Sequence, residues 1–200
     1  MNRIAKPVIA AALLASATAY PASAETCRDR FVRLLVGGSG DGAVKIHVTQ
    51  EIKGAPASQN WFYQQAPGHW MTEMIEPAGQ PWVLTHADVM YTSADHGESW
   101  TKLRALDSDP DAATAQMEAN AQTAKNEVCG NEELDGVMFD TVEADYVSMQ
   151  GFKSENHHKY WVHPETGFIA KAVYHLKSEG FESTTTQLIE AAPDLTLPTP

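Results

Sequence analysis

The feature that most constrains this chain is a series of short segments in which apolar and polar residues alternate. In residues 44–49, Val or Ile alternates with Lys, His or Thr. A period of two residues predicts a half-buried β-strand. Pro- and Gly-containing turns separate most of these runs, which predicts an antiparallel sheet of about ten strands. Further strand-like runs cover residues 59–65, 69–75, 82–86, 89–92, 137–141, 146–149, 159–163, 168–176 and 181–190.

Two segments have the period of a helix instead. Residues 28–36 place Phe31, Leu34 and Leu35 on one side, and two glycines follow. These features predict a short first helix. Asp109 and Pro110 suit the start of a second helix, as N-cap and first helical residue. We expect this helix to run to about Glu127 and to stop before Gly130, with Met117, Ala121, Ala124 and Val128 as its apolar stripe.

Residues 1–24 have the pattern of a secretory signal peptide. Arg3 and Lys6 precede an Ala- and Leu-rich run, and residues 22–24 are Ala-Ser-Ala. The run is shorter than the ~20 residues that span a bilayer. We therefore expect export, in a bacterium to the periplasm, of a single domain over residues 25–200 that spans no membrane.

The two cysteines, Cys27 and Cys129, are expected to form a disulfide in an oxidising compartment. Two buried thiols or a metal pair are the alternatives. Lys and Arg number 14 against 26 Asp and Glu, for a formal net charge of −12. Such a balance argues against nucleic acid as a partner and against a basic helix held on anionic lipid.

Residues 93–100, Ser-Ala-Asp-His-Gly-Glu-Ser-Trp, fit the S-x-D-x-G-x-[ST]-W pattern of an Asp-box. In such a turn we expect Asp95 to accept amide hydrogen bonds, Gly97 to relax the backbone and Trp100 to pack underneath. One copy is too few for a propeller. We interpret the motif as a hairpin connection rather than a sign of glycan chemistry.

Metal binding is a weaker hypothesis. Asp107, Asp109, Asp111 and Glu118 have the spacing of EF-hand ligands, but Ala112 stands where that loop needs Gly. Helix capping explains the same acids. Imidazole and thioether groups suit copper, although no tight ligand pattern is present. The residues concerned are His47, His69, His86, His96, His157, His158, His163, His175, Met71, Met74 and Met90.

No pattern for a catalytic nucleophile or a phosphate loop is present, so we expect a non-enzymatic protein without a cofactor. Aromatic and Met residues are concentrated on the strands. A curved antiparallel sheet has a concave face that helices must cover, and short helices leave room for an apolar cavity. The residues predicted to line this cavity are Trp61, Tyr63, Trp70, Met74, Trp82, Tyr91 and Tyr160.

The chain resembles the LolA/LolB-like superfamily of periplasmic lipoprotein carriers and their relatives, which includes RseB-type sensors. Residues 159–171 look like the family's hairpin of aromatic strand, D-x-x-T-G turn and strand, with His163 at the usual Asp. Residues 62–70 are similar to its "kPGrfRW" strand pair, and residues 191–198 to its closing segment. The carrier's arginine on that strand pair has no counterpart in residues 68–71.

The resemblance implies an α+β fold in which a large curved antiparallel sheet, an incomplete β-barrel, carries helices over its concave face. It also implies a cavity that holds acyl chains. We therefore expect a periplasmic protein that binds a lipid or other apolar small molecule in a half-barrel cavity. The alternatives are an envelope-stress or integrity protein that binds an envelope partner without a ligand, and a calcium- or copper-binding protein.

Overall fold

A computed structural model describes residues 25–200 apart from 39, 41, 108 and 150, so the expected signal peptide lies outside the described residues. The described residues form two helices and an eleven-stranded antiparallel sheet. The helices are α1 (Cys27–Gly37) and α2 (Pro110–Gln122). The strands are β1 (Val44–Ile52), β2 (Ser58–Ala66), β3 (His69–Glu76), β4 (Trp82–His86), β5 (Val89–Ser93), β6 (Thr101–Ala105), β7 (Lys125–Leu134), β8 (Val137–Ser148), β9 (Ser154–Val162), β10 (Ile169–Ser178) and β11 (Phe181–Ala191).

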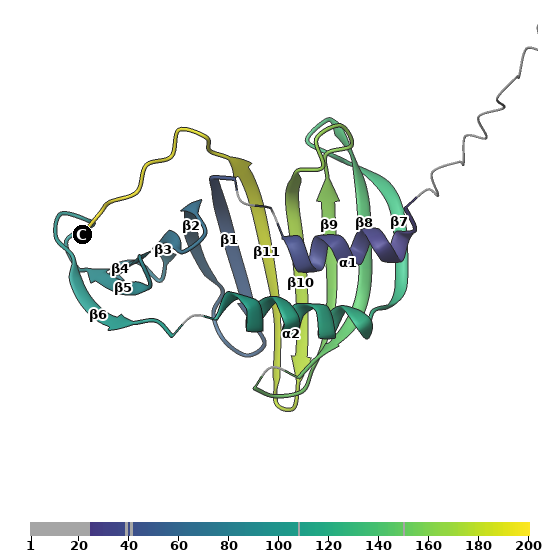
Figure 1. Cartoon of the computed structure of the whole chain (residues 1–200), viewed down its shortest axis with the longest axis horizontal. Helices are drawn as coiled ribbons and strands as arrows, with labels where there is room; N and C mark the ends of the chain where they lie inside the picture. The colour runs from purple at the N-terminus through teal and green to yellow at the C-terminus, as the bar shows by residue number, and fades with distance from the viewer. Residues whose placement is uncertain (1–24, 39, 41, 108, 150) are drawn as a thin grey trace, which may run out of the picture.

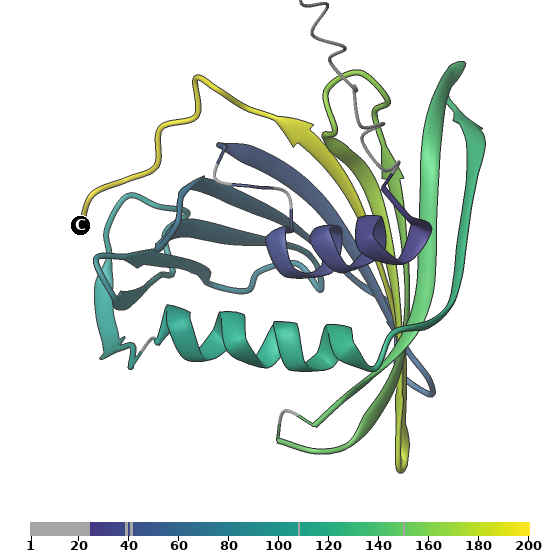
Figure 2. The same ribbon diagram turned by 45° about the vertical axis from the view of Figure 1, so that its right-hand side comes forward.

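The strands follow the order β6-β5-β4-β3-β2-β1-β11-β10-β9-β8-β7, and the sheet does not close into a barrel. Figure 2 shows the sheet curving around the two helices, which lie across its concave side. In Figure 1 the α1 ribbon crosses β8–β10 and α2 runs below it. The expected α+β fold, an open curved sheet with helices over its concave face, is confirmed.

Each helix starts at a side-chain cap, and that of α2 is the expected Asp109. The Thr26 side chain accepts a hydrogen bond from the Asp29 amide, and the Asp109 carboxylate accepts one from the Ala112 amide at 2.9 Å. These bonds satisfy amides that a helix leaves unpaired in its first turn. Gly38, at φ 54°, ends α1 by donating its amide to the Leu34 carbonyl at 2.9 Å.

A first core fills the space between the helices and the sheet. Phe31, Leu34 and Leu35 of α1 are buried, as are Ala121 and Ala124 at the end of α2. Their partners on the concave face are Val44, Ile46, Val142, Ala144, Tyr146, Tyr160, Val162, Ile169, Ala172 and Ile189. The helical spacing of the α1 residues and the alternation in β1 therefore meet in one layer, as the sequence pattern predicts.

A second, smaller core lies on the convex face of β2–β5. Met71 and Leu84 are buried there together with Leu197 of the C-terminal tail. The tail is held by hydrogen bonds, because the Leu197 amide donates to Gln65 Oε1 at 2.8 Å and His69 Nε2 lies 3.1 Å from the Pro198 carbonyl oxygen. The Pro-rich tail forms no strand, as expected, but it covers an apolar surface.

The end of α2 differs from the sequence-based expectation. The helix ends at Gln122 rather than near Glu127, and β7 begins at Lys125. The Thr123 hydroxyl accepts the Val147 amide at 2.8 Å, which brings the chain beside β8. The ten-residue strand β7, which pairs with β8, then takes the place of the last helical turn. Val128, expected in the apolar stripe, is 54% exposed on β7.

Cys27 and Cys129 form the expected disulfide, with Cα atoms 5.8 Å apart at a sequence separation of 102. The bond joins the first residue of α1 to β7, the edge strand, rather than to the end of α2. Within the described part of the chain, no helix has the length and apolar character needed to cross a membrane.

Candidate functional site

Helices cover the concave face of the sheet unevenly. The principal contacts of α1 and α2 are with one another and with β7 and β8, at one side of the sheet. Within α2, Asn120 and Ala121 are buried, whereas residues 110–115 are exposed. The N-terminal half of α2 therefore does not pack tightly on the sheet. Strands β2–β5 are on the side of the concave face that these packed helix contacts leave free.

Apolar side chains occupy this part of the concave face. Residues opposite one another in antiparallel strands share a face, so the register places Phe62 beside the core residue Ile46. The same reasoning through β3, β4 and β5 defines what we call the uncovered apolar face, whose members are all half-buried. It consists of Phe62, Trp70, Met74, Val83 and Met90.

Phe62 links the uncovered apolar face to the first core and to Trp70. The rings of Phe62 and Trp70 are stacked, with centroids 5.6 Å apart and planes at 28°. Phe62 also packs against the buried cluster under the helices. Because Met side chains adapt to irregular shapes, Met74 and Met90 suit the wall of a site for apolar ligands of variable form.

Polar groups also stand among these apolar side chains, and the register places Thr72 between Phe62 and Val83 and Thr92 beside Val83. Thr85 pairs with Trp70 on one side and Met90 on the other, and is only 1% exposed. Its hydroxyl has no hydrogen-bond partner within the described chain. Arg104 pairs with Met90 at the β6 edge and is exposed. The site therefore combines apolar side chains with the threonine hydroxyls of the same face, and Arg104 lies on the strand at its rim.

The seven predicted cavity residues are divided between the two faces. Trp70 and Met74 belong to the uncovered apolar face. Tyr160 also faces the concave side, but it is buried in the first core, with its ring centroid 6.0 Å from that of Phe31. The other four lie on the convex face. They are Trp61, Tyr63, Trp82 and Tyr91.

Each of the four convex residues has its own surroundings there. The ammonium of Lys45 lies 3.9 Å above the Trp61 ring. Tyr63, Trp82 and Tyr91 pack against the second core. Tyr63 donates to Glu73 Oε2 at 3.1 Å, and burial together with this carboxylate raises the pKa of its phenol to about 12.

Sequence reasoning did not single out Phe62, Val83, Thr85 or Arg104 for this face. The sequence does indicate that Phe62 faces away from Trp61 and Tyr63, because successive side chains of a strand point to opposite faces. The choice of face needs the register with Ile46, which the structure supplies.

A buried polar cluster lies on the other half of the concave face. His158 Nε2 is 3.0 Å from the Tyr146 hydroxyl, and His158 Nδ1 is 3.0 Å from the Tyr160 hydroxyl. Burial lowers the pKa of His158 to about 3 and raises that of Tyr146 to about 12. A neutral imidazole donates through one nitrogen and accepts through the other, so it satisfies both hydroxyls. The cluster is a neutral hydrogen-bonded unit at physiological pH.

The convex face of β8–β10 carries charged and imidazole groups. His157 Nδ1 lies 2.9 Å from Asp145 Oδ1, and Nε2 lies 3.3 Å from Glu143 Oε2. A hollow of about 390 Å³ is lined in part by Asp145, His157 and His175. Even so, no group of three or more His, Cys, Asp or Glu among the described residues is placed to hold a metal ion.

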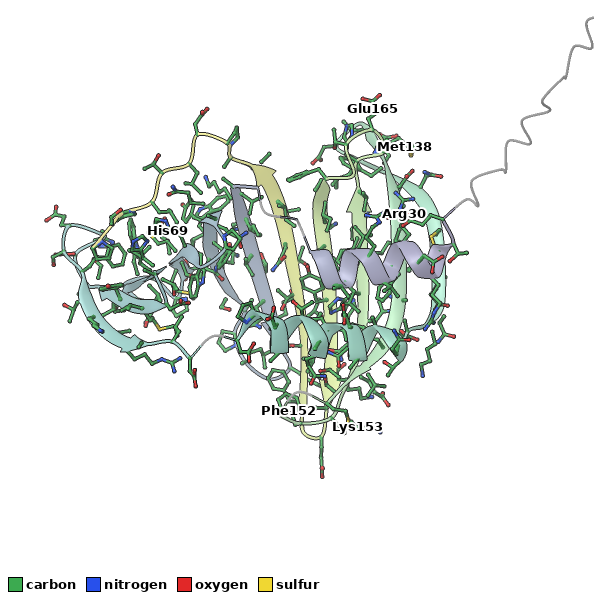
Figure 3. All side chains as sticks on the ribbon, in the orientation of Figure 1. Arg30, His69, Met138, Phe152, Lys153 and Glu165 are labelled. Carbon is green, nitrogen blue, oxygen red and sulfur yellow. A yellow bond between two sulfur atoms is a disulfide. The ribbon has the colours of Figure 1, made fainter. Side chains whose placement is uncertain are left out.

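A larger hollow, of about 910 Å³, lies at the end of the sheet where β8 leads to β9 and β10 to β11. Phe152 and Phe181 line it and are 56% and 39% exposed, with Lys153 and Lys177 beside them. Figure 3 labels Phe152 and Lys153 at this lower end of the molecule. None of the seven predicted residues lines either hollow.

The Asp-box residues form the connection between β5 and β6, as expected. Asp95 Oδ1 accepts the Ser99 amide at 2.9 Å and the Ser93 hydroxyl at 2.7 Å. These hydrogen bonds hold the pKa of Asp95 well below its usual range. Gly97 has φ 91°, and Trp82 lies close beneath its α-carbon. The motif is a structural turn whose tryptophan, Trp100, packs on the second core.

No family model matches the sequence, and no curated protein matches it. Solved structures do resemble the fold. A LolA superfamily protein from Nitrosomonas europaea is 9% identical, with 85% of this chain and 93% of that chain covered and a TM-score of 0.36. A chain of the Pseudomonas aeruginosa MucA/MucB complex is 12% identical, with 84% and 58% covered and a TM-score of 0.47.

The hypothetical lipoprotein YmcC from Escherichia coli is also similar, at 10% identity, with 86% of this chain and 100% of that chain covered and a TM-score of 0.26. These matches agree with the LolA-like resemblance of the sequence. At 9–12% identity and TM-scores below 0.5 the likeness concerns the fold and carries no information about ligand or partner.

Proposed function

We propose that this protein is a periplasmic binding protein that holds a lipid or another apolar small molecule against the uncovered apolar face. The observation that supports the proposal is the half-buried set Phe62, Trp70, Met74, Val83 and Met90. These side chains remain partly accessible beneath a helix whose N-terminal half is not packed on the sheet. A protein of this kind needs no catalytic group.

The expected affinity follows from the transfer of apolar surface out of water. Each methylene that the face removes from water stabilises the complex by about 0.8 kcal/mol. A chain of ten to twelve carbons therefore gives enough to offset the cost of association, which is several kcal/mol. Export is proposed from the pattern of residues 1–24, and the Cys27–Cys129 disulfide suits an oxidising compartment.

The test is a titration of lipid-free protein with dodecan-1-ol, followed by tryptophan fluorescence. Trp70 lies on the uncovered apolar face, so its emission is expected to shift to shorter wavelength on binding. Met74→Asp places a charge on this face and should abolish the shift. Met138→Asp is the matched control, because Met138 is exposed at the start of β8 (Figure 3). Absence of binding by the unaltered chain, or equal binding by both variants, would overturn the proposal.

The lower hollow supports a second candidate function, an interaction protein that contacts an envelope partner. Phe152 and Phe181 project from neighbouring turns, and monomeric proteins rarely expose paired aromatic residues without a use for them. A photoreactive residue at position 152 should then cross-link one defined envelope protein in intact cells. The same residue at position 188, where Leu188 is exposed on β11, serves as the control.

A further inference from the structure

One row of cross-strand pairs leads from the middle of the uncovered apolar face to its rim. Gln64 of β2 pairs with Trp70, Trp70 with Thr85, Thr85 with Met90, and Met90 with Arg104. Because paired residues share a face, Arg104 lies on the concave side at the β6 end of this row, next to Met90. The buried, unpartnered hydroxyl of Thr85 lies two strands inward.

Arg104 differs from the other arginines in the described part of the chain. Arg28, Arg30 and Arg33 each form an ion pair with a carboxylate, at 2.6, 2.7 and 2.9 Å. Arg104 forms no ion pair with a described residue, although the sequence contains 26 Asp and Glu. Among the concave-facing paired residues of β2–β6 in the described segments, it is the one charged side chain.

We propose that the occupant of this face is a single-chain amphiphile with an anionic headgroup, bound with its headgroup at Arg104. This inference rests on the proposed function. The acyl chain lies along Met90, Trp70 and Phe62. The carboxylate or phosphate accepts hydrogen bonds from the guanidinium, whose planar arrangement of donors suits both anions.

Lys102 provides the control that the structure makes possible. It lies two residues from Arg104 on the same exposed strand, but it pairs with Tyr91 and therefore faces the convex side. Charged residues on an edge strand also prevent pairing between molecules, and both cations would serve that purpose equally. A headgroup site, by contrast, needs Arg104 and not Lys102.

The experiment measures the dissociation constants of lipid-free, full-chain protein for dodecanoate and for dodecan-1-ol at low salt. The unaltered protein should bind dodecanoate about tenfold more tightly, which is the usual effect of a hydrogen bond to a charged group. Arg104→Gln should remove this preference and leave dodecan-1-ol binding unchanged, whereas Lys102→Gln should change neither. Unchanged melting temperatures will show that both variants are folded.

The possible failures are distinguishable. If dodecan-1-ol binds and dodecanoate has no advantage, or if both variants lose the same small amount, the headgroup proposal is overturned and the proposed function stands. If neither ligand binds, the proposed function itself fails. A parallel titration with 1-dodecanoyl-glycerol-3-phosphate identifies the source of the anion. Tighter binding of this ligand than of dodecanoate assigns the headgroup to a lysophospholipid, and equal or weaker binding assigns it to a fatty acid.

Discussion

Trp70 and Met71 are consecutive residues of β3 that belong to different apolar layers. Trp70 stacks on Phe62 on the concave face, whereas Met71 is buried on the convex face with Leu84 and Leu197. At these two positions β3 therefore packs on apolar side chains on both faces, whereas a strand of an antiparallel sheet usually has one polar face toward solvent. The consequence is that substitutions at neighbouring positions should have separable effects, on ligand binding at Trp70 and on stability at Met71.

Loss of the disulfide should destabilise the protein. Cys27→Ser or Cys129→Ser releases a link between positions 102 apart in sequence, and a disulfide typically stabilises a protein by about 2–4 kcal/mol. For a domain of this size we expect a fall in melting temperature of roughly 5–15 °C. Calorimetry under oxidising conditions measures the fall. Reductant should bring the unaltered protein to the same value, and a double-serine variant should melt no lower than either single variant.

The stability of the protein should fall in mild acid because of His158. The pKa of this residue is about 3 in the folded state, below the ordinary value of 6.5. A lowered histidine pKa means that the unfolded chain binds the proton more tightly. The contribution of neutral, buried His158 to the free energy of unfolding is therefore complete above pH 6.5 and is lost as the pH falls from 6.5 towards 3. Between pH 7 and pH 5 this amounts to about 2 kcal/mol, measurable by urea unfolding.

A variant separates this effect from that of the carboxylates. Asp145, Glu132 and Glu182 also have lowered pKa values, and their contributions are lost in acid too. His158→Gln has no titrating ring, so the difference in unfolding free energy between variant and parent should shrink by about 2 kcal/mol from pH 7 to pH 5. A constant difference would show that burial of His158 does not perturb its titration.

The C-terminal tail should contribute to stability through Leu197. Its side chain is 5% exposed within the second core, so Leu197→Ala should cost about 2–4 kcal/mol. Thr196 is exposed, and Thr196→Ala should cost little. Urea denaturation measures both variants. If removal of residues 193–200 left stability unchanged, the tail would not be part of the second core in solution.

The Asp-box turn should open when Asp95 is replaced. In Asp95→Ala the Ser99 amide and hydroxyl lose their acceptor, and the Ser93 hydroxyl loses its partner. Hydrogen exchange at Ser99 should therefore become faster, with little change in β8–β10. Glu98→Ala, an exposed change in the same turn, is the control. Equal exchange in the two variants would contradict the assigned role of Asp95.

Much of the fold was predictable because one side of most elements faces a single core. The alternation of Val44, Ile46 and Val48 and the helical spacing in α1 follow directly from burial under the helices. Strand β6 was not expected, because all five of its residues are exposed and an edge strand without a buried face has no alternation to detect. The end of α2 was misplaced because the pairing of β7 with β8 overrides a weak helical stripe.

The candidate site was only partly predictable. Trp61, Phe62 and Tyr63 are consecutive aromatic residues, so composition indicates an apolar surface without saying which face each residue joins. Both faces of β2–β5 carry apolar side chains, the convex one beneath the tail and the concave one in the uncovered apolar face, so a simple alternation of apolar and polar residues is absent. Arg104 lies on β6, a strand that the sequence did not predict. Its position beside Met90 follows only from the pairing of β5 with β6.

Every pair of neighbouring strands is also consecutive in sequence, except β1 and β11. The chain builds β1–β6 outward from this pair, crosses to the opposite edge through α2, and returns through β7–β11 (Figure 1). Only the pairing of β1 with β11, in which Val44 pairs with Ala191, therefore requires the chain to close a long loop and to pay its entropic cost. The molecule consists of two locally paired meanders joined along one seam. A cut between β6 and α2 would accordingly leave two segments that keep all their internal strand pairings and stay linked through the Cys27–Cys129 disulfide.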